Sequence, residues 1–176
     1  MKQINNLLEK TSKPKFLIFL TVLTILNFVV IGILTAQIGI VSGGETLLDF
    51  SIGHTMDGVT TTLTNYGTEG VVLYRWVQLI DLVHPLVYSM LFATLFFLLL
   101  RGTRFTPLVY FPLAGGVLDY LENIFIFIMI KSFPNIDMLV VQTASLVSYA
   151  KNGAMWVTVS VFLIGLVFFI VRRKMK

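Results

Sequence analysis

Hydrophobic residues fall in long, nearly uninterrupted runs, and charged residues stand mostly between these runs. Residues 16–41, 107–131 and 138–171 are each long enough, as a helix, to cross a hydrocarbon core of roughly 30 Å, which takes about 20 apolar residues. A fourth run, residues 85–100, becomes a full span only if its helix begins upstream, near residue 76. The pattern therefore predicts four transmembrane helices at residues 16–41, 76–100, 107–131 and 138–171.

The longest polar segment, residues 42–75, separates the first two spans. Breakers and turn residues mark both of its ends, and Thr55–Leu63 between them is predicted to form a short helix. Thr68-Glu69 is typical of a helix N-terminus, where the second long helix is expected to open. The other connections are short, which makes the last three spans antiparallel neighbours. We expect an all-α, four-helix transmembrane bundle in one domain, residues 1–176, with an extracytoplasmic loop at residues 42–75.

Three prolines bear on the geometry of these helices. Pro107 is predicted to open the third span, because a first-turn proline gives up no hydrogen bond. Pro85 and Pro112 are predicted to bend the second and third spans.

Basic residues predict the orientation of the bundle, since Lys and Arg are enriched in cytoplasmic segments. Only Arg75 and Lys131 fall on the other side of a four-span arrangement. The cytoplasmic set is Lys2, Lys10, Lys13, Lys15, Arg101, Arg104, Arg172, Arg173, Lys174 and Lys176. The first apolar run exceeds the roughly 7–15 residues of a signal-peptide core, so it is expected to be retained. We therefore predict a multi-pass protein of the plasma or bacterial inner membrane, with both termini cytoplasmic.

Composition narrows the chemistry. The chain is 56% hydrophobic and 12% charged, whereas soluble domains carry roughly 25% charged residues. It has no cysteine, which excludes disulfides, thiolate nucleophiles and CxxC redox sites. The net charge of +4 does not indicate nucleic acid, because the basic residues flank apolar runs. The sequence also lacks a Gly-x-Ser-x-Gly nucleophile motif, and we expect no cofactor.

Ionisable residues occur inside the predicted spans, where each costs about 2.5–3.5 kcal/mol at the membrane centre. At 1.5 Å per residue, counting from the basic residues beyond each span places them at one depth, roughly 22–31 Å away. Each of the last three spans has one polar stripe. These stripes predict a pocket that opens outward beneath the loop, with the first span as an apolar wall. The residues expected to bind a ligand there are Arg75, Gln78, Asp81, His84, Tyr88, Asn123, Ser148, Tyr149 and Asn152.

The acids of the third span are the strongest chemical feature. Asp119 and Glu122 lie on one helix face and would repel each other unless one is protonated or neutralised by Lys151. If the protein is an enzyme, these three residues are the expected catalytic groups. The alternative is an ion-pair network that ties three helices together and binds nothing.

Three functions fit this sequence. The leading hypothesis is binding or transport of a small charged or amphipathic ligand, and the second is an intramembrane enzyme that performs acid–base chemistry on a lipid or isoprenoid. The third is a structural membrane subunit. Expected partners are the bilayer, a lipid or small molecule, and a second copy of the chain. His54 and His84, with Asp57, Asp81 and Glu122 nearby, are residue types that can bind a metal, but His54-x-x-Asp57 is a weak signal and no metal is predicted.

Overall fold

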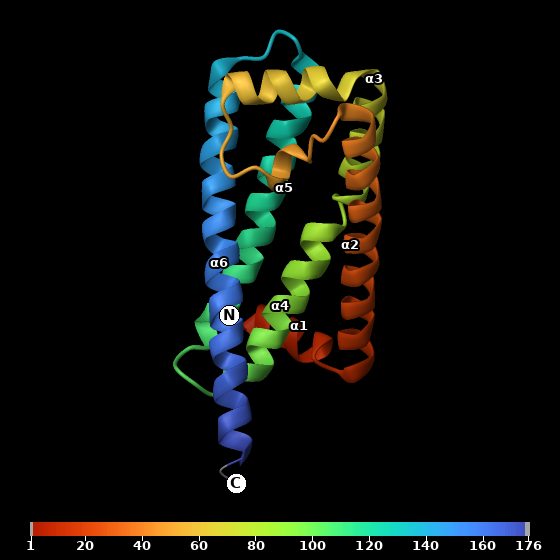
Figure 1. The fold of residues 1–176 in the computed structure, drawn as a ribbon. Coiled ribbons are helices and arrows are strands. Elements are labelled where there is room, and N and C mark those ends of the chain that lie inside the picture. The colour runs from red at the N-terminus through yellow and green to blue at the C-terminus, as the bar shows by residue number, and fades with distance from the viewer. Residues whose placement is uncertain (1, 175–176) are drawn as a thin grey trace.

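The computed structural model describes residues 2–174 as a helical bundle (Figure 1). The elements are α1 (Lys2–Thr11), α2 (Pro14–Ser42), η1 (Leu48–Phe50), α3 (Met56–Ile80), α4 (His84–Leu100), η2 (Thr106–Val109), α5 (Tyr110–Ser132) and α6 (Met138–Lys174). No strand occurs within residues 2–174. Four stretches are long and apolar enough to cross a membrane: Pro14–Ser42, Met56–Leu100, Thr106–Ser132 and Met138–Phe168. The predicted all-α architecture with four apolar spans is confirmed, and it fits a multi-pass membrane protein.

The two ends of the bundle differ in what covers them (Figure 1). At one end, here called the α1 end, α1 lies across the helices and α6 runs out toward the C-terminus. The opposite end is covered by the first half of α3, which runs across the end of the bundle. We call this the strap end, after the segment described next.

The strap, residues Gly43–Thr55, connects α2 to α3 and folds back into the bundle below the first half of α3 (Figure 1). Leu47 and Leu48 are buried, which anchors the segment in the apolar core. Within residues 42–75, which the sequence assigns to the loop, residues 56–75 belong to α3, and the strap lies among the helices instead of outside them. The apolar Leu47-Leu48 pair explains this, because its burial releases it from water.

α3 begins at Met56 after an N-cap, Thr55, whose hydroxyl accepts the Gly58 amide at 3.1 Å. Its direction changes at Gly67, where φ is +56° and ψ is −161°. Residues with a side chain rarely adopt this left-handed backbone, whereas glycine does so readily. The helix predicted at Thr55–Leu63 is thus present, and a second helical run follows the kink as expected from Thr68.

The second span is broken between Ile80 and His84. The cause is Pro85, which has no amide to donate to the carbonyl of Asp81 and whose ring would clash with that carbonyl in a continuous helix. The freed carbonyl of Leu82 accepts a hydrogen bond from the Tyr120 hydroxyl at 2.6 Å. The bend predicted at Pro85 is therefore a complete break, and the span predicted as one helix over residues 76–100 consists of two.

Pro112 does not bend a helix interior. It is the third residue of α5, whose first turn requires no proline amide, so the predicted kink there was wrong. Pro107 lies in η2, the short helix that leads into α5, in agreement with its predicted role at the start of the third span.

Two apolar clusters fill the interior, one toward each end. The cluster at the strap end includes Leu47, Tyr66 and Ile126, and joins α2, the strap, α3, α5 and α6. The cluster at the α1 end includes Leu8 of α1 and Phe96 of α4, both almost fully buried. Between the two clusters lies the layer that contains the buried ionisable residues.

Candidate functional site

The strap is held in the bundle by side chains of α6 and α3. The Ser148 hydroxyl donates to the carbonyl of Ser51 at 3.0 Å and accepts the Gly53 amide at 3.3 Å. The Tyr74 hydroxyl donates to Oδ1 of Asp49 at 2.6 Å. These bonds bring Asp49, a carboxyl of the strap, into the layer formed by the long helices.

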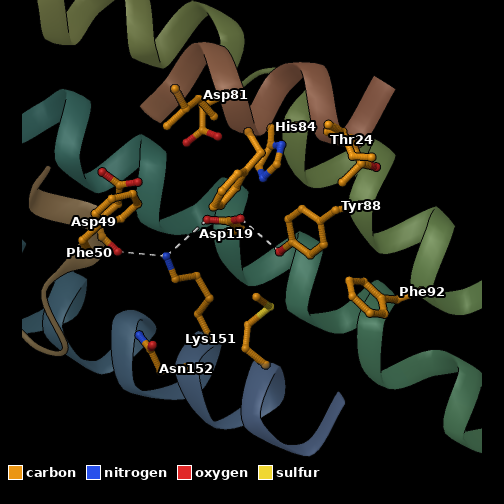
Figure 2. Close-up of a pocket in the computed structure, with 14 residues that line it drawn as sticks. Thr24, Asp49, Phe50, Asp81, His84, Tyr88, Phe92, Asp119, Lys151 and Asn152 are labelled. Atoms are coloured by element: carbon orange, nitrogen blue, oxygen red, sulfur yellow. Dashed lines mark hydrogen bonds and ion pairs between the residues drawn. The ribbon is translucent and has the colours of Figure 1, made fainter. Parts of the chain in front are cut away.

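Lys151 of α6 is the centre of this layer. Its Nζ forms an ion pair with Glu122 Oε2, lies 3.4 Å from Asp119 Oδ1 and donates to the backbone carbonyl of Asp49 at 3.3 Å. The Lys151 side chain is about nine-tenths buried. Its ammonium ends among oxygen atoms from α5 and the strap (Figure 2).

Polar neighbours hold the acids in place. The Tyr88 hydroxyl donates to Asp119 Oδ2 at 3.0 Å, and Asn123 Nδ2 donates to Asp81 Oδ2 at 3.0 Å. The first bond joins α4 to α5, and the second joins α5 to the break after α3. The layer is thus a connected arrangement in which α4, α5, α6, the strap and the break at Asp81 all take part.

Glu122 lies behind Lys151 and is completely inaccessible to solvent. Besides Lys151, it faces His54 of the strap, whose Nε2 is 3.7 Å from Glu122 Oε1. His54 is itself oriented by its backbone amide, which donates to Ser145 Oγ at 3.0 Å. Glu122 therefore fixes Lys151 and the strap, and it has no free surface toward a ligand.

A cavity of about 560 Å³ adjoins this layer, within the range of roughly 300–1,000 Å³ that is typical of small-molecule sites. Its polar side is formed by Asp49, Asp81, Asp119 and Lys151, and Figure 2 shows the ammonium of Lys151 pointing toward the carboxyl group of Asp119. The remaining wall is mostly apolar. Its apolar residues are Ile25, Phe28, Ile31, Phe50, Phe92 and Met155.

The cavity reaches the surface of the bundle between α2 and α6. α2 packs mainly on α3 and α4, and α6 packs mainly on α5, so within residues 2–174 the contact between α2 and α6 is at most marginal. Lining residues from both helices are exposed: Ile25 and Phe28 on α2, and Met155 on α6. All three lie within the apolar spans. The opening therefore points sideways, whereas the sequence predicts an opening beneath the loop; the strap and the first half of α3 cover that end of the bundle.

Six of the predicted site residues line the cavity: Asp81, His84, Tyr88, Asp119, Lys151 and Asn152. Three others support it from outside, namely Glu122, Asn123 and Ser148. Arg75, Gln78 and Tyr149 are not among its lining residues. Arg75 and Tyr149 are exposed on other faces, and Tyr149 lies against Gly53 of the strap.

Periodicity misplaced Arg75 and Gln78 for a specific reason. It assumed one continuous helix through Asp81, so that these residues would share a face with Tyr88. The break before His84 resets the helical phase, and the face of α3 no longer continues that of α4.

Asp49 is the main residue that the sequence did not identify. It sits in a segment that pattern alone marks as an extramembrane loop, and only the neighbouring Leu47-Leu48 pair hints that the segment returns to the core. Burial raises the pKa of the Asp49 carboxyl, an effect opposed by the hydrogen bond from Tyr74 and by the charge of Lys151. Asp49 therefore retains a proton more readily than an exposed carboxyl does.

The described residues include no group of three or more His, Cys, Asp or Glu side chains arranged to hold a metal ion. His54 faces Glu122, whereas His84 packs against the ring of Tyr88 with centroids 5.2 Å apart. The two histidines considered together from the sequence therefore take part in separate contacts.

Comparison of the chain with protein-family models, curated proteins and solved structures gives no match. The four long apolar helices fit the class of multi-pass membrane proteins.

Proposed function

We propose that this chain binds a small amphipathic molecule from within the bilayer, and that the polar end of this molecule is positively charged. The observation that supports this most directly is the cavity between α2 and α6, which joins an apolar entrance to a cluster of carboxyl groups. Sites of this kind recognise an apolar body by area and orient it by a few polar groups.

The sign of the ligand charge follows from the composition of the layer. The layer contains four acidic residues: Asp49, Asp81, Asp119 and Glu122. The cation among them is Lys151, which forms ion pairs with Asp119 and Glu122. Glu122 and Lys151 neutralise each other, which leaves the carboxyls on the cavity wall to be balanced by protons or by another cation. Uncompensated charge is costly inside a membrane, so a ligand that brings a positive group is favoured over a neutral or anionic one.

The apolar entrance favours a molecule that arrives through the membrane. Ile25 and Phe28 are more than half exposed on the lipid-accessible face of α2. A hydrocarbon chain passing between them and Met155 stays in apolar surroundings along its whole path. Its charged end can then reach the carboxyl groups on the cavity wall, which include those of Asp81 and Asp119.

Three probes with the same hydrocarbon chain test this directly: dodecylamine, dodecanol and dodecanoate, each added below its micellar range to purified protein in mild detergent. We expect the amine to raise the midpoint of thermal unfolding more than the other two, because binding to the folded state stabilises it. The amine effect should fall in Asp81→Asn, which keeps the shape of the cavity and removes one charge. Equal shifts by the amine and the carboxylate would exclude a cation-selective site.

A matched pair of variants separates the cavity from general insertion of the probes into detergent. Ile25→Trp fills the entrance and should abolish the amine effect. Ile33→Trp places the same side chain on the same helix, at an exposed position outside the cavity, and should leave the effect intact. If both variants responded alike, the probe would be acting elsewhere.

Untargeted mass spectrometry of molecules retained by wild-type protein, but not by Ile25→Trp, would then identify the natural ligand class. A retained basic amphiphile supports the proposal. Its recovery in a chemically altered form would instead support the lipid-directed enzyme, and accumulation inside proteoliposomes would extend binding to transport.

We also propose that the α1 end is cytoplasmic. The turn Arg101–Phe105, α1 and the end of α6 lie at this end, and most basic residues belong to them (Figure 1). Because the chain has no cysteine, single variants Thr103→Cys and Asn135→Cys give a clean test with a membrane-impermeant maleimide. In intact cells Asn135→Cys should react and Thr103→Cys should not, and the reverse result would invert the orientation.

A further inference from the structure

A second hollow, of about 340 Å³, lies at the α1 end, between the last turn of α4, the turn that follows it and α6. It shares no lining residue with the cavity described above. Its walls are mostly apolar and come from two segments that are distant in sequence. The apolar residues that form it include Leu99, Leu108, Val161, Ile164 and Phe168.

Gly165 gives this groove its depth. A Cβ at this position would lie 3.5 Å from Leu99 Cδ1, which is ordinary van der Waals contact. Any longer side chain would therefore occupy the space between α4 and α6. The groove thus depends on a residue without a side chain at the point where two apolar spans face each other.

The rim of the groove is positively charged. Arg101 lines it directly, and the guanidinium of Arg104 lies 4.9 Å from the centroid of the Phe105 ring, another lining residue. The only acidic residue in the segments at this end is Glu9 of α1, among residues 2–174.

We propose that this groove is a binding site for an anionic phospholipid, with one acyl chain between α4 and α6 and the headgroup phosphate at Arg101 and Arg104. The apolar walls belong to helices that fit a membrane span, so hydrocarbon is their natural surrounding. The arginines stand where the spans end, which is the level of lipid phosphates. Guanidinium groups bind phosphate through paired hydrogen bonds, so the basic rim complements a headgroup with a net negative charge. It should bind a zwitterionic headgroup, which has no net charge, more weakly.

The experiment is a titration of the purified, detergent-solubilised chain with phosphatidylglycerol or phosphatidylcholine of identical acyl chains, read by native mass spectrometry. We expect phosphatidylglycerol to bind more tightly. A basic residue near an anionic headgroup contributes about 1 kcal/mol, or about five-fold in affinity, so Arg101→Gln with Arg104→Gln should weaken phosphatidylglycerol about 30-fold. Binding of phosphatidylcholine should change little.

Two further variants make the test specific. Gly165→Leu fills the groove and should weaken both lipids, because it removes the site of the acyl chain. Lys131→Gln removes an exposed cation at the strap end and should change neither. Since Arg101, Arg104 and Lys131 are all exposed, their substitution leaves the folded core intact, which a thermal unfolding curve verifies.

Equal affinity of wild-type protein for the two lipids would overturn the proposal, as would an undiminished preference in the double arginine variant. Inorganic phosphate supplies the last arm. If it displaced phosphatidylglycerol at similar concentrations, the site would be one for free phosphate, and the groove would have no part in recognition.

Discussion

The two ends of the bundle are stabilised in different ways. At the α1 end, Leu8, Phe96 and neighbouring apolar residues form a compact cluster, and α1 is further joined to α4 by the hydrogen bond between Thr11 Oγ1 and Thr94 Oγ1 at 2.7 Å. Toward the strap end, an apolar cluster of comparable burial sits beside a layer of acids around Lys151. Replacing a buried ion pair by apolar residues is often neutral or stabilising. The stability of the bundle therefore does not by itself explain why the charged layer is present.

The largest expected effect tests whether Lys151 is what makes the charged layer tolerable. Lys151→Met leaves Glu122 and Asp119 without their cation, and breaking a buried pair in this way costs about 3–5 kcal/mol. We expect a strongly lowered midpoint of thermal unfolding in detergent. Adding Glu122→Gln should recover much of the loss, because the amide needs no counter-charge.

The recovery is the informative part of that experiment. If the double variant were as unstable as the single one, Lys151 would stabilise the protein through the packing of its stem. The ion pairs would then not distinguish the strap end from the α1 end in stability. The coupling between the two substitutions measures the ion pair separately from the shape of the side chains.

A smaller effect is expected where α4 and α5 approach closely beside the charged layer. A Cβ on Gly116 would lie 2.8 Å from Ser89 Cβ and 3.0 Å from the carbonyl of Pro85. Gly116→Ala should therefore destabilise the protein by about 1–3 kcal/mol through overpacking.

Gly153→Ala is the matched control, because nothing lies within 4 Å of its Cβ position. There alanine should be neutral or raise stability by up to about 1 kcal/mol, since glycine is unfavourable in a helix. Equal effects of the two substitutions would contradict the close approach.

The same contrast explains what the sequence could predict. The apolar spans follow from hydrophobicity alone, since each needs only to remain out of water. Asp119 and Lys151 could also be assigned to one layer, because rise per residue fixes depth in a continuous helix. Asp49 could not, because its position depends on Tyr74 and Ser148 holding a strap from elsewhere in the chain. Contacts between distant segments leave no periodic signal.

Helix continuity is the second limit. The faces of a helix can be calculated only while the helix is unbroken, and Pro85 allows either a bend or a full break. The structure has the break, stabilised by the Tyr120 hydroxyl on the carbonyl of Leu82, and this contact again joins different spans. For that reason Tyr88 lines the cavity, as the face of its own helix predicts, whereas Arg75 does not.

A somewhat smaller loss of stability than for Gly116→Ala is expected where Ser148 holds the strap. Ser148→Ala removes both hydrogen bonds to the strap, at Ser51 and Gly53, and leaves these backbone groups to find other partners. The expected loss is about 1–2 kcal/mol. Amide hydrogen exchange should increase over residues 43–55 while the α1 end stays protected. Ser160→Ala, at an exposed position of α6, should leave exchange in the strap unchanged. A uniform increase along the chain would instead mean that Ser148 supports the whole bundle.

The smallest effect is a pH dependence that belongs to the strap end alone. Burial raises the pKa of Asp49 in the folded protein, so the folded state holds this proton more tightly than the unfolded chain does. The resulting stabilisation is complete below the unfolded pKa of about 3.9 and is lost as pH rises through the folded-state pKa. Asp49→Asn lacks this titration and can still accept the Tyr74 hydroxyl. The unfolding midpoint of wild-type protein, relative to that of Asp49→Asn, should therefore fall as pH is raised above about 4.

The same comparison for Asp57→Asn, at an exposed position of α3, supplies the reference slope. If the Asp49 and Asp57 differences changed equally with pH, burial of the strap carboxyl would have no energetic consequence, and the two ends of the bundle would respond to protons alike.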